Sequence, residues 1–365
     1  MPPLRRLLLV VTATLLAPVC ATPGIRETAR FSATIAQLSE PGGFFNSDNL
    51  ISNERSYLHV IPALREAGLN GGAYLGVGPD QNFTYIAHTR PSIAFIIDIR
   101  RDNLLLHLLL KALFRLSDNR AEYVSLLFGR PPPDHAARWK HADIERIVEY
   151  IDATAAPPEA TATVQARVRA AIRGIGLPVT EADLDRIEGF HRTFIERGLG
   201  VQFESAGRPP RSDYPTYRQL LLETDKGGRR WNYLASESDF QFVRSLQERN
   251  LVVPVVGDLA GPTAMRAIGR LLKERGDRLS VFYTSNVEYY LASRGVFEQF
   301  VANLAELPHA DRSVIIRSVF PNRFGWTPRM PGYLSDSFVQ PVGDLLDGVA
   351  SGRIREYGDL ITTAR

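Results

Sequence analysis

The sequence of 365 residues contains almost no cysteine, with a single Cys at position 20. An internal disulfide framework and a cysteine-based metal site are therefore excluded. The seven histidines are scattered, and neither H-E-x-x-H nor C-x-x-C occurs, so no metal centre is predicted. The sequence also lacks the G-x-S-x-G elbow of serine hydrolases. No P-loop lysine follows its glycine-rich stretch, which disfavours ATP or GTP hydrolysis.

Excess charge and long apolar runs are also missing. The formal net charge is +3, and two of the cations, Arg5 and Arg6, lie in the N-terminal segment. We therefore expect no nucleic-acid partner, because such proteins carry concentrated positive charge. After residue 21 no apolar run approaches the roughly 18 residues that cross a bilayer. The composition, 44% hydrophobic, supplies enough apolar material for one large domain.

Residues 1–21 have the pattern of an export signal. Two arginines precede an apolar run from residue 7 to residue 17, and a small-residue stretch, Val19 to Ala21, resembles a cleavage site. We predict a periplasmic protein whose mature chain starts near Thr22. The alternative is a lipoprotein anchored through Cys20, for which Val19 is an unfavourable preceding residue.

The most informative stretch begins at residue 71, where a short apolar run meets glycines. Residues 73–77 are a consecutive, mainly apolar run without helical periodicity, and this pattern predicts a buried strand that ends at Gly78. Gly76 and Gly78 have no Cβ, so a ligand could approach the backbone there. Pro79 and Asp80 supply turn and helix-start chemistry. These four residues are therefore candidates for contact with a cofactor.

A second apolar run, residues 92–97, ends at Asp98. In Rossmann-type units an acid about twenty residues after the glycine loop accepts hydrogen bonds from ribose hydroxyls, and the spacing from Gly76 to Asp98 agrees. The alternative is that glycines simply follow a buried strand, since the loop reads G-V-G-P and not the full G-x-G-x-x-G.

The strand and helix alternation returns after residue 250. We predict a doubly wound α/β fold with a mainly parallel sheet, with strands near 73–78, 93–98, 251–257, 279–284 and 313–319. Residues 104–249 are expected to form a mostly helical insertion. Ligands of such sheets bind outside the carboxyl ends of the strands. Gly78, Asp98, Asp258 and Ser285 should therefore border one crevice.

Three further features near these strands have two interpretations each. The polar residues Ser52, Asn53 and Glu54 are expected either to line the mouth of the crevice and contact substrate, or only to cap helices. Arg100 and Arg101 are expected to pair with Asp102 and not with an anionic ligand. The last feature is a histidine within a leucine-rich segment, at position 107, expected to be a core residue and not a ligand.

Four blocks, at residues 71–87, 94–107, 249–269 and 282–291, resemble those of an uncharacterised bacterial family. Some members of that family are exported or are lipoproteins, and its fold is similar to class I S-adenosylmethionine-dependent methyltransferases. The resemblance implies a Rossmann-like domain over residues 22–365 and S-adenosylmethionine as the tentative cofactor. It would place Gly76 and Gly78 at the methionine moiety, Asp98 on the ribose, and Asp258 with Leu259 at the adenine.

The same resemblance implies that residues 285–289 face the substrate. Ser285 and Asn286 would contact the acceptor, Glu288 would be the catalytic base, and Tyr289 would pack against the substrate; Glu54 is the rival base. The alternative for Glu288 is that it only caps the following helix. The function predicted is a methyltransferase-like protein of unknown small-molecule substrate. The alternative is an exported ligand-binding or interaction protein without methyl transfer.

Overall fold

The computed structural model describes residues 23–205, 207–208, 211–320 and 330–363. The predicted export signal at residues 1–21, with Cys20, lies outside the described residues and stays a prediction.

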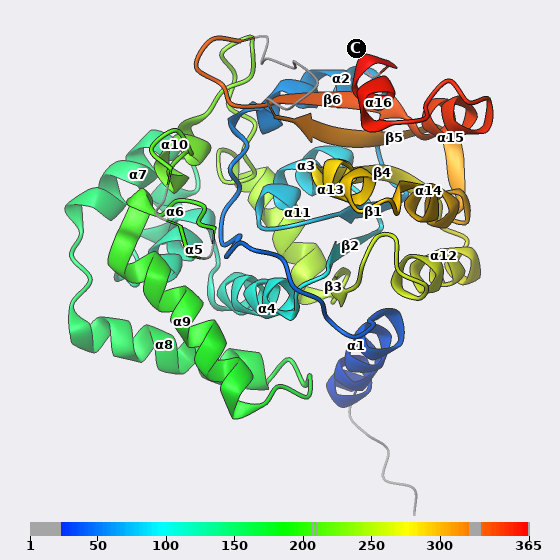
Figure 1. The fold of residues 1–365 in the computed structure, drawn as a ribbon. Coiled ribbons are helices and arrows are strands. Elements are labelled where there is room, and N and C mark those ends of the chain that lie inside the picture. The colour runs from blue at the N-terminus through cyan, green and yellow to red at the C-terminus, as the bar shows by residue number, and fades with distance from the viewer. Residues whose placement is uncertain (1–22, 206, 209–210, 321–329, 364–365) are drawn as a thin grey trace, which may run out of the picture.

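A six-stranded sheet forms the centre of the molecule, in the order β3-β2-β1-β4-β5-β6 (Figure 1). The first five strands in this order are parallel, and β6 is antiparallel to β5. The strands are β1 (Ala73–Gly76), β2 (Ile93–Asp98), β3 (Val252–Val256), β4 (Leu279–Ser285), β5 (His309–Val319) and β6 (Asp336–Pro341). The prediction of an α/β protein with a mainly parallel sheet is therefore confirmed. β1 is shorter than predicted, β5 begins earlier, and β6 was not predicted.

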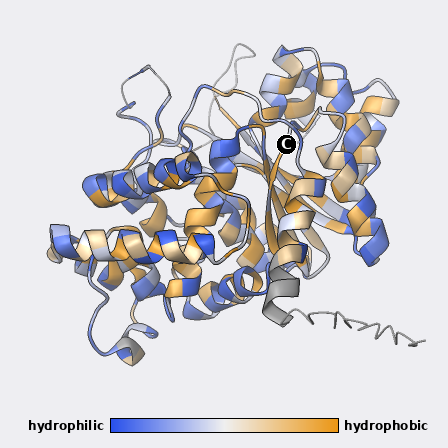
Figure 2. Cartoon of the chain, turned by 90° about the horizontal axis from the view of Figure 1, so that it is seen from below, coloured by the Kyte–Doolittle hydropathy of each residue, from blue (hydrophilic) through white to orange (hydrophobic). Residues whose placement is uncertain are grey.

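β2 and β3 lie where continuous apolar runs occur, as is typical of parallel strands that are buried on both faces. Residues 93–97 of β2 and all of β3 are buried. Figure 2 shows apolar strands between helices whose outer faces are hydrophilic. β3 tolerates Pro254 because it is an edge strand and pairs only with β2.

Two groups of helices sandwich the sheet. Helix α11 packs against both α3 and α4 in the first group, α12 packs against both α1 and α14 in the second, and α15 packs on β5 and β6. These helices are α1 (Pro23–Leu38), α3 (Gln81–Thr89), α4 (Arg101–Leu116), α11 (Glu237–Glu248), α12 (Ala264–Arg275), α14 (Phe297–Ala305) and α15 (Val342–Ala350). The shorter elements are η1 (Arg55–Val60), α2 (Ile61–Glu66), α13 (Val287–Ser293) and α16 (Tyr357–Thr363).

The chain between β2 and β3 forms a helical lobe beside the sheet, at the left in Figure 1. It comprises α5 (Arg120–Leu127), α6 (Ala136–Trp139), α7 (Ile144–Ala153), α8 (Pro158–Arg173), α9 (Glu181–Arg197), η2 (Gly198–Gly200) and α10 (Tyr217–Leu222). Helices α8 and α9 pack on α4, which itself contacts β2 and β3. α4 is thus a crossover helix of the sheet as well as the base of the lobe.

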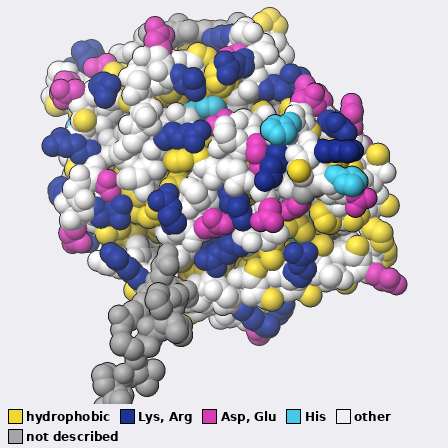
Figure 3. Space-filling view, turned by 180° about the vertical axis from the view of Figure 1, so that it is seen from behind, with side chains coloured by type: hydrophobic (Ala, Val, Ile, Leu, Met, Phe, Trp, Pro, Cys, Tyr) yellow, Lys and Arg dark blue, Asp and Glu magenta, His cyan; other side chains and the backbone are white. Residues whose placement is uncertain are grey.

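The surface carries charges of both signs. On the face in Figure 3, Lys and Arg side chains are interspersed with Asp and Glu. Within the described part of the chain, no helix combines the length and the apolar character that crossing a bilayer requires.

Candidate functional site

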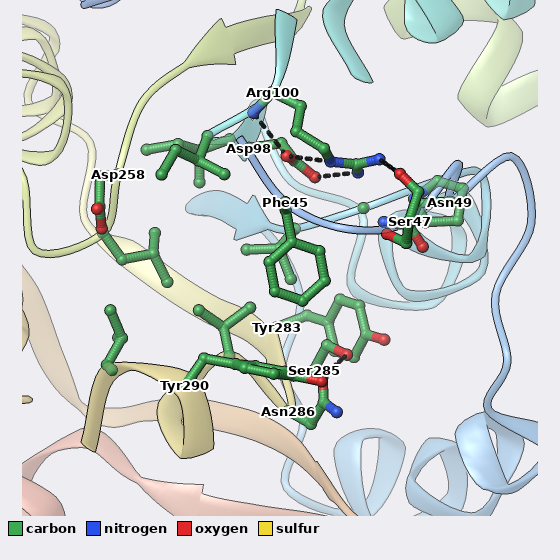
Figure 4. Close-up of a pocket in the computed structure, with 18 of the residues that line it drawn as sticks. Phe45, Ser47, Asn49, Asp98, Arg100, Asp258, Tyr283, Ser285, Asn286 and Tyr290 are labelled. Atoms are coloured by element: carbon green, nitrogen blue, oxygen red, sulfur yellow. Dashed lines mark hydrogen bonds and ion pairs between the residues drawn. The ribbon is translucent and has the colours of Figure 1, made fainter. Parts of the chain in front are cut away.

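A cavity of about 440 Å³ lies at the carboxyl ends of the parallel strands β1 to β4 (Figure 4). Its walls come from the last residues of β2 and β4, from the residues that follow all four strands and from the segment that precedes η1, with Phe203 added by the helical lobe. The lining residues are Phe44, Phe45, Ser47, Asn49, Ser52, Asn53, Glu54, Val77, Gly78, Pro79, Ile97, Asp98, Ile99, Arg100, Phe203, Gly257, Asp258, Leu259, Tyr283, Ser285, Asn286, Val287, Tyr290, Leu291 and Arg294. The predicted convergence of four strand ends is therefore observed.

Residues 39–54, which we term the covering segment, run across these strand ends. The Glu40 N–H donates to the Val256 carbonyl at 2.9 Å, and the Gly43 N–H donates to the Ile99 carbonyl at 2.7 Å. A Cβ at Gly43 would lie 2.6 Å from the Ile99 side chain, so a larger residue there would force that side chain to shift. The segment is thus fixed to the ends of β3 and β2, and it brings Phe45 into the cavity.

The two glycines of the loop after β1 have different roles. Gly78 lines the cavity and has a φ of +81°, a conformation that favours glycine. Gly76 does not line it: a Cβ there would lie 1.9 Å from Asn82 Oδ1. The Asn82 amide occupies that space and donates to the carbonyls of Val77 and Pro79, at 2.9 and 2.7 Å. The predicted role of Gly76 at a cofactor is therefore replaced by a packing role.

Asp98 lines the cavity, but Arg100 holds its carboxylate. The Arg100 backbone N–H and Nε donate to Oδ1 at 2.9 and 3.0 Å, and Nη2 donates to Oδ2 at 2.7 Å. Arg100 Nη1 also donates to the carbonyls of Ser47 and Asp48 in the covering segment. A carboxylate has about four acceptor positions, so about one remains for a ligand at Asp98.

The expected pairing of both arginines with Asp102 is therefore wrong. Arg100 pairs with Asp98, Arg101 pairs with Asp183, and Asp102 pairs with Arg186 of α9. Helix α9 of the lobe supplies the partners of Arg101 and Asp102, and their distance along the sequence hid them from local inference, whereas Asp98 lies only two residues before Arg100.

Asp80 points away from the cavity that Pro79 lines. Its Oδ2 accepts hydrogen bonds from the hydroxyls of Tyr217, at 2.5 Å, and Tyr233, at 3.3 Å. Burial raises the pKa of Asp80 to about 6, and the two tyrosine hydrogen bonds oppose this shift. Asp80 therefore connects the glycine loop to the helical lobe and does not face a cavity ligand.

The loop after β3 contributes Asp258 and Leu259 to the cavity wall, as predicted. Asp258 Oδ1 accepts from the Ala260 N–H, and Oδ2 pairs with Arg294 Nη1, both at 3.0 Å. The Arg294 side chain is 55% exposed, so solvent screens this pair.

The end of β4 places Ser285 and Asn286 at the cavity. Ser285 has a φ of +54°, in the left-handed region that few non-glycine residues adopt. Its hydroxyl donates a short hydrogen bond to Glu54 Oε1. Such strained residues cluster at ligand and active sites, which marks Ser285 as a candidate of that kind.

Glu54 lines the cavity beside the predicted Ser52 and Asn53. It is only 1% exposed. Its Oε2 accepts from Tyr283 OH at 2.8 Å, from Gln81 Nε2 at 3.3 Å and from Ser318 Oγ. Among the described residues, no Lys, Arg or His nitrogen lies within 4.0 Å of its carboxylate. Glu54 is thus a buried carboxylate held by neutral donors.

Glu288, the base implied by the resemblance, lies outside the cavity. Arg317 Nε donates to its Oε2 at 2.6 Å and Arg317 Nη2 donates to its Oε1 at 3.1 Å, and both side chains are 1% exposed. Tyr289 lies in a neighbouring groove that shares Tyr290 with the cavity. The structure therefore brings the rival base Glu54 to the cavity, and it brings neither Glu288 nor Tyr289 there.

Three aromatic residues of the wall were not selected from the sequence. Phe44 and Phe45 follow a glycine pair that marks a break, which was their only signal. Phe203 belongs to the helical lobe and had none. The Phe45 ring projects into the cavity, edge-to-face with Tyr290 at a centroid distance of 4.9 Å (Figure 4).

The expectation of a core histidine is confirmed. His107 is buried, and its Nε2 lies 2.9 Å from the Gly78 carbonyl. Burial lowers its pKa to about 4. His107 thus supports the glycine loop from below.

Across the described residues, no group of three or more His, Cys, Asp or Glu side chains is arranged to hold a metal ion. No curated protein matches the chain. Residues 50–176 and 181–363 match a family described as a domain of unknown function (DUF7790), and these two ranges cover most of the sequence. The chain therefore belongs to this family of unknown function.

Proposed function

We propose that this protein binds a small organic molecule in the strand-end cavity, as a Rossmann-like protein of the class I methyltransferase type. The observation that carries the proposal is the position of the cavity. The order of the strands reverses between the parallel neighbours β1 and β4, because β2 and β3 follow on one side of β1 and β4 and β5 on the other, and residues that follow β1 and β4 line the cavity. Open α/β sheets bind ligands at such a switch point. The volume of about 440 Å³ suits a small ligand.

S-adenosylmethionine is the first ligand to test. Parallel strands in the order β3-β2-β1-β4-β5, followed by the antiparallel β6, support a methyltransferase-like sheet more than a fully parallel dinucleotide-binding one. Asp98 and Asp258 lie at the ends of β2 and β3, where the resemblance assigns them to ribose and adenine. Apolar side chains such as Leu259 supply a surface for a purine ring.

In a methyl-transfer reaction the protein would have little covalent work, because the sulfonium is already an activated donor. Catalysis would rest on aligning the acceptor and removing its proton. Glu54 replaces Glu288 as the candidate base, since it lines the cavity and Glu288 is held by Arg317. Asn286 lies beside Ser285 and is the candidate for orienting the acceptor.

Binding without methyl transfer is the second candidate, and three observations favour it. Arg100 uses most of the hydrogen-bond acceptor positions of the Asp98 carboxylate, and the Asn82 side chain fills the space beside Gly76. Four donors surround Glu54, which weakens it as a base. The predicted export also favours this candidate, because S-adenosylmethionine is a cytoplasmic metabolite.

Calorimetric titration of the purified protein with S-adenosylmethionine and S-adenosylhomocysteine tests the proposal. We expect saturable binding that Asn286→Trp abolishes by filling the cavity. Ser293→Trp is the matched control, since Ser293 is an exposed residue of the adjoining helix α13. Binding that survives Asn286→Trp would contradict the proposed site. The absence of heat and of a thermal shift at millimolar ligand would contradict S-adenosylmethionine as the ligand.

Transfer of a labelled methyl group from the donor to acceptor mixtures separates the two candidates. Donor-dependent turnover that Glu54→Gln reduces would support the enzyme. Saturable binding with no turnover would support the binding protein.

A further inference from the structure

The charges that line the cavity do not balance. Five described lining residues are charged: Glu54, Asp98, Arg100, Asp258 and Arg294. Two ion pairs, Asp98 with Arg100 and Asp258 with Arg294, account for four of them. Glu54 remains, so the described wall carries one net negative charge, at its most buried carboxylate.

The burial of Glu54 among neutral donors strengthens the attraction of its charge for a positive ligand group. Its donors are hydroxyl groups and one amide, which satisfy the oxygens but supply no positive charge. Burying a carboxylate without a cation costs free energy, and electrostatic interactions are stronger in the interior than in water. A positive group in the cavity would therefore gain more at Glu54 than at the solvent-screened Asp258.

Aromatic side chains supply a second feature that attracts cations. Phe44, Phe45, Phe203, Tyr283 and Tyr290 all line the cavity. Phe44 and Tyr290, 81% and 37% exposed, are the exposed large hydrophobic residues of the described chain, and both lie at this site. Aromatic faces attract ammonium groups and also cover apolar ligand surface.

We propose that the natural ligand is an organic cation with an apolar or aromatic body. Its ammonium or sulfonium centre lies beside Glu54, Tyr283 and Ser285, and its body lies against Phe45 and Tyr290. This inference rests on the proposed function, because it specifies the ligand class of the same cavity. It requires neither methyl transfer nor an adenosine group.

Three small probes of similar size test the charge preference. Benzyltrimethylammonium is a permanent cation, benzyl alcohol is neutral and phenylacetate is an anion. We expect calorimetry on the purified protein to show the cation binding at least about tenfold more tightly than the other two, which corresponds to about 1.4 kcal/mol.

Two substitutions assign the preference to Glu54. Glu54→Gln keeps the shape of the side chain and removes its charge, so we expect the preference for the cation to disappear. Glu298→Gln makes the same change of net charge at an exposed position of α14 and should keep the preference. Should Glu54→Gln fail to fold, the order of the wild-type affinities for the three probes still tests the preference for a cation. Tyr290→Ala, at the rim, should then weaken all three probes alike.

The outcomes separate the inference from the proposed function. Equal affinities for the three probes, or a cation preference that survives in Glu54→Gln, would overturn the inference and leave the cavity as a binding site. No binding of any probe, nor of S-adenosylmethionine or S-adenosylhomocysteine, would overturn both.

Discussion

Glu54 and Glu288 are equally buried, at 1% exposure, but their surroundings differ. Arg317 matches Glu288 in charge and in geometry, through two hydrogen bonds. Within the described part of the chain, Glu54 receives hydrogen bonds only from neutral donors, and it borders a cavity. A carboxylate paired with arginine is neutralised and contributes to the fold, whereas one held by hydroxyls keeps a net charge that a ligand can neutralise.

The largest effect is expected at the paired site. Glu288→Gln leaves the Arg317 guanidinium buried without a counter-charge, which should reduce the free energy of unfolding by about 3–5 kcal/mol. Chemical denaturation monitored by circular dichroism measures this. Replacing both residues by methionine is the control and should recover most of the loss. A change below about 1 kcal/mol in the single variant would contradict a structural role for the pair.

Asp80 adds a third buried carboxylate, held by two tyrosine hydroxyls. Its folded pKa of about 6 exceeds the usual 3.8, so between these pH values the folded state binds more protons than the unfolded state. Asp80 therefore stabilises the fold most below about pH 4, and this contribution is lost as pH rises through 6. Relative to Asp80→Asn, the wild type should lose roughly 1–3 kcal/mol between pH 4 and pH 7.

The measurement is the difference between the two proteins in urea midpoint across this pH range. The difference is needed because His107, whose pKa is lowered, acts with the opposite sign over the same range. Parallel profiles for the wild type and Asp80→Asn would contradict the prediction.

At the unpaired site the effect on stability should be small. Glu54→Gln preserves the oxygen that accepts from Tyr283 and Ser318, and the Ser285 hydroxyl can accept from the new amide. We expect the free energy of unfolding to change by no more than about 1 kcal/mol. Thermal and urea unfolding check this. A loss comparable with that of Glu288→Gln would show that Glu54 is needed mainly for folding.

The smallest effect is expected at the solvent-screened pair. Arg294→Ala removes the partner of Asp258, and exposed ion pairs typically contribute about 0–1 kcal/mol. The melting temperature should therefore hardly change, while the wall gains a second uncompensated negative charge. Binding of benzyltrimethylammonium should strengthen slightly. Weaker binding of this cation would contradict the charge argument.

The strands could be predicted where burial on both faces leaves an uninterrupted apolar run, as at residues 93–97 and 252–256. β6 was missed because Asp336–Pro341 is an antiparallel edge strand with polar residues along it. β5 begins earlier than predicted because residues 310–312 are exposed and include the charged Asp311 and Arg312, so no apolar run marks them. An apolar run indicates that a strand is buried. Prediction from such runs therefore fails where part of a strand is exposed to solvent.

The position of the site in the fold, and the strand ends that surround it, could be predicted from the sequence. The rule that parallel strands end at one edge correctly placed Gly78, Asp98, Asp258 and Ser285 around one cavity. It could not predict which of the charged side chains form ion pairs with one another. Arg100 turns back onto Asp98, and Arg317 reaches Glu288 from β5. The Arg317 pair depends on packing between separate segments, and the local Arg100 pair is fixed by the carbonyls of Ser47 and Asp48 in the covering segment, which is distant in the sequence.

The covering segment also protects an edge of the sheet. None of the described strands lies on the outer side of β3, and an exposed edge can recruit strands from other molecules. At its end, the Val256 N–H donates to Ser39 Oγ and the Val256 carbonyl accepts from the Glu40 N–H. Pro254, in the middle of β3, has no N–H to offer. The segment that closes the ligand cavity therefore also hinders edge-to-edge aggregation, so substitutions in residues 39–43 are expected to reduce solubility as well as binding.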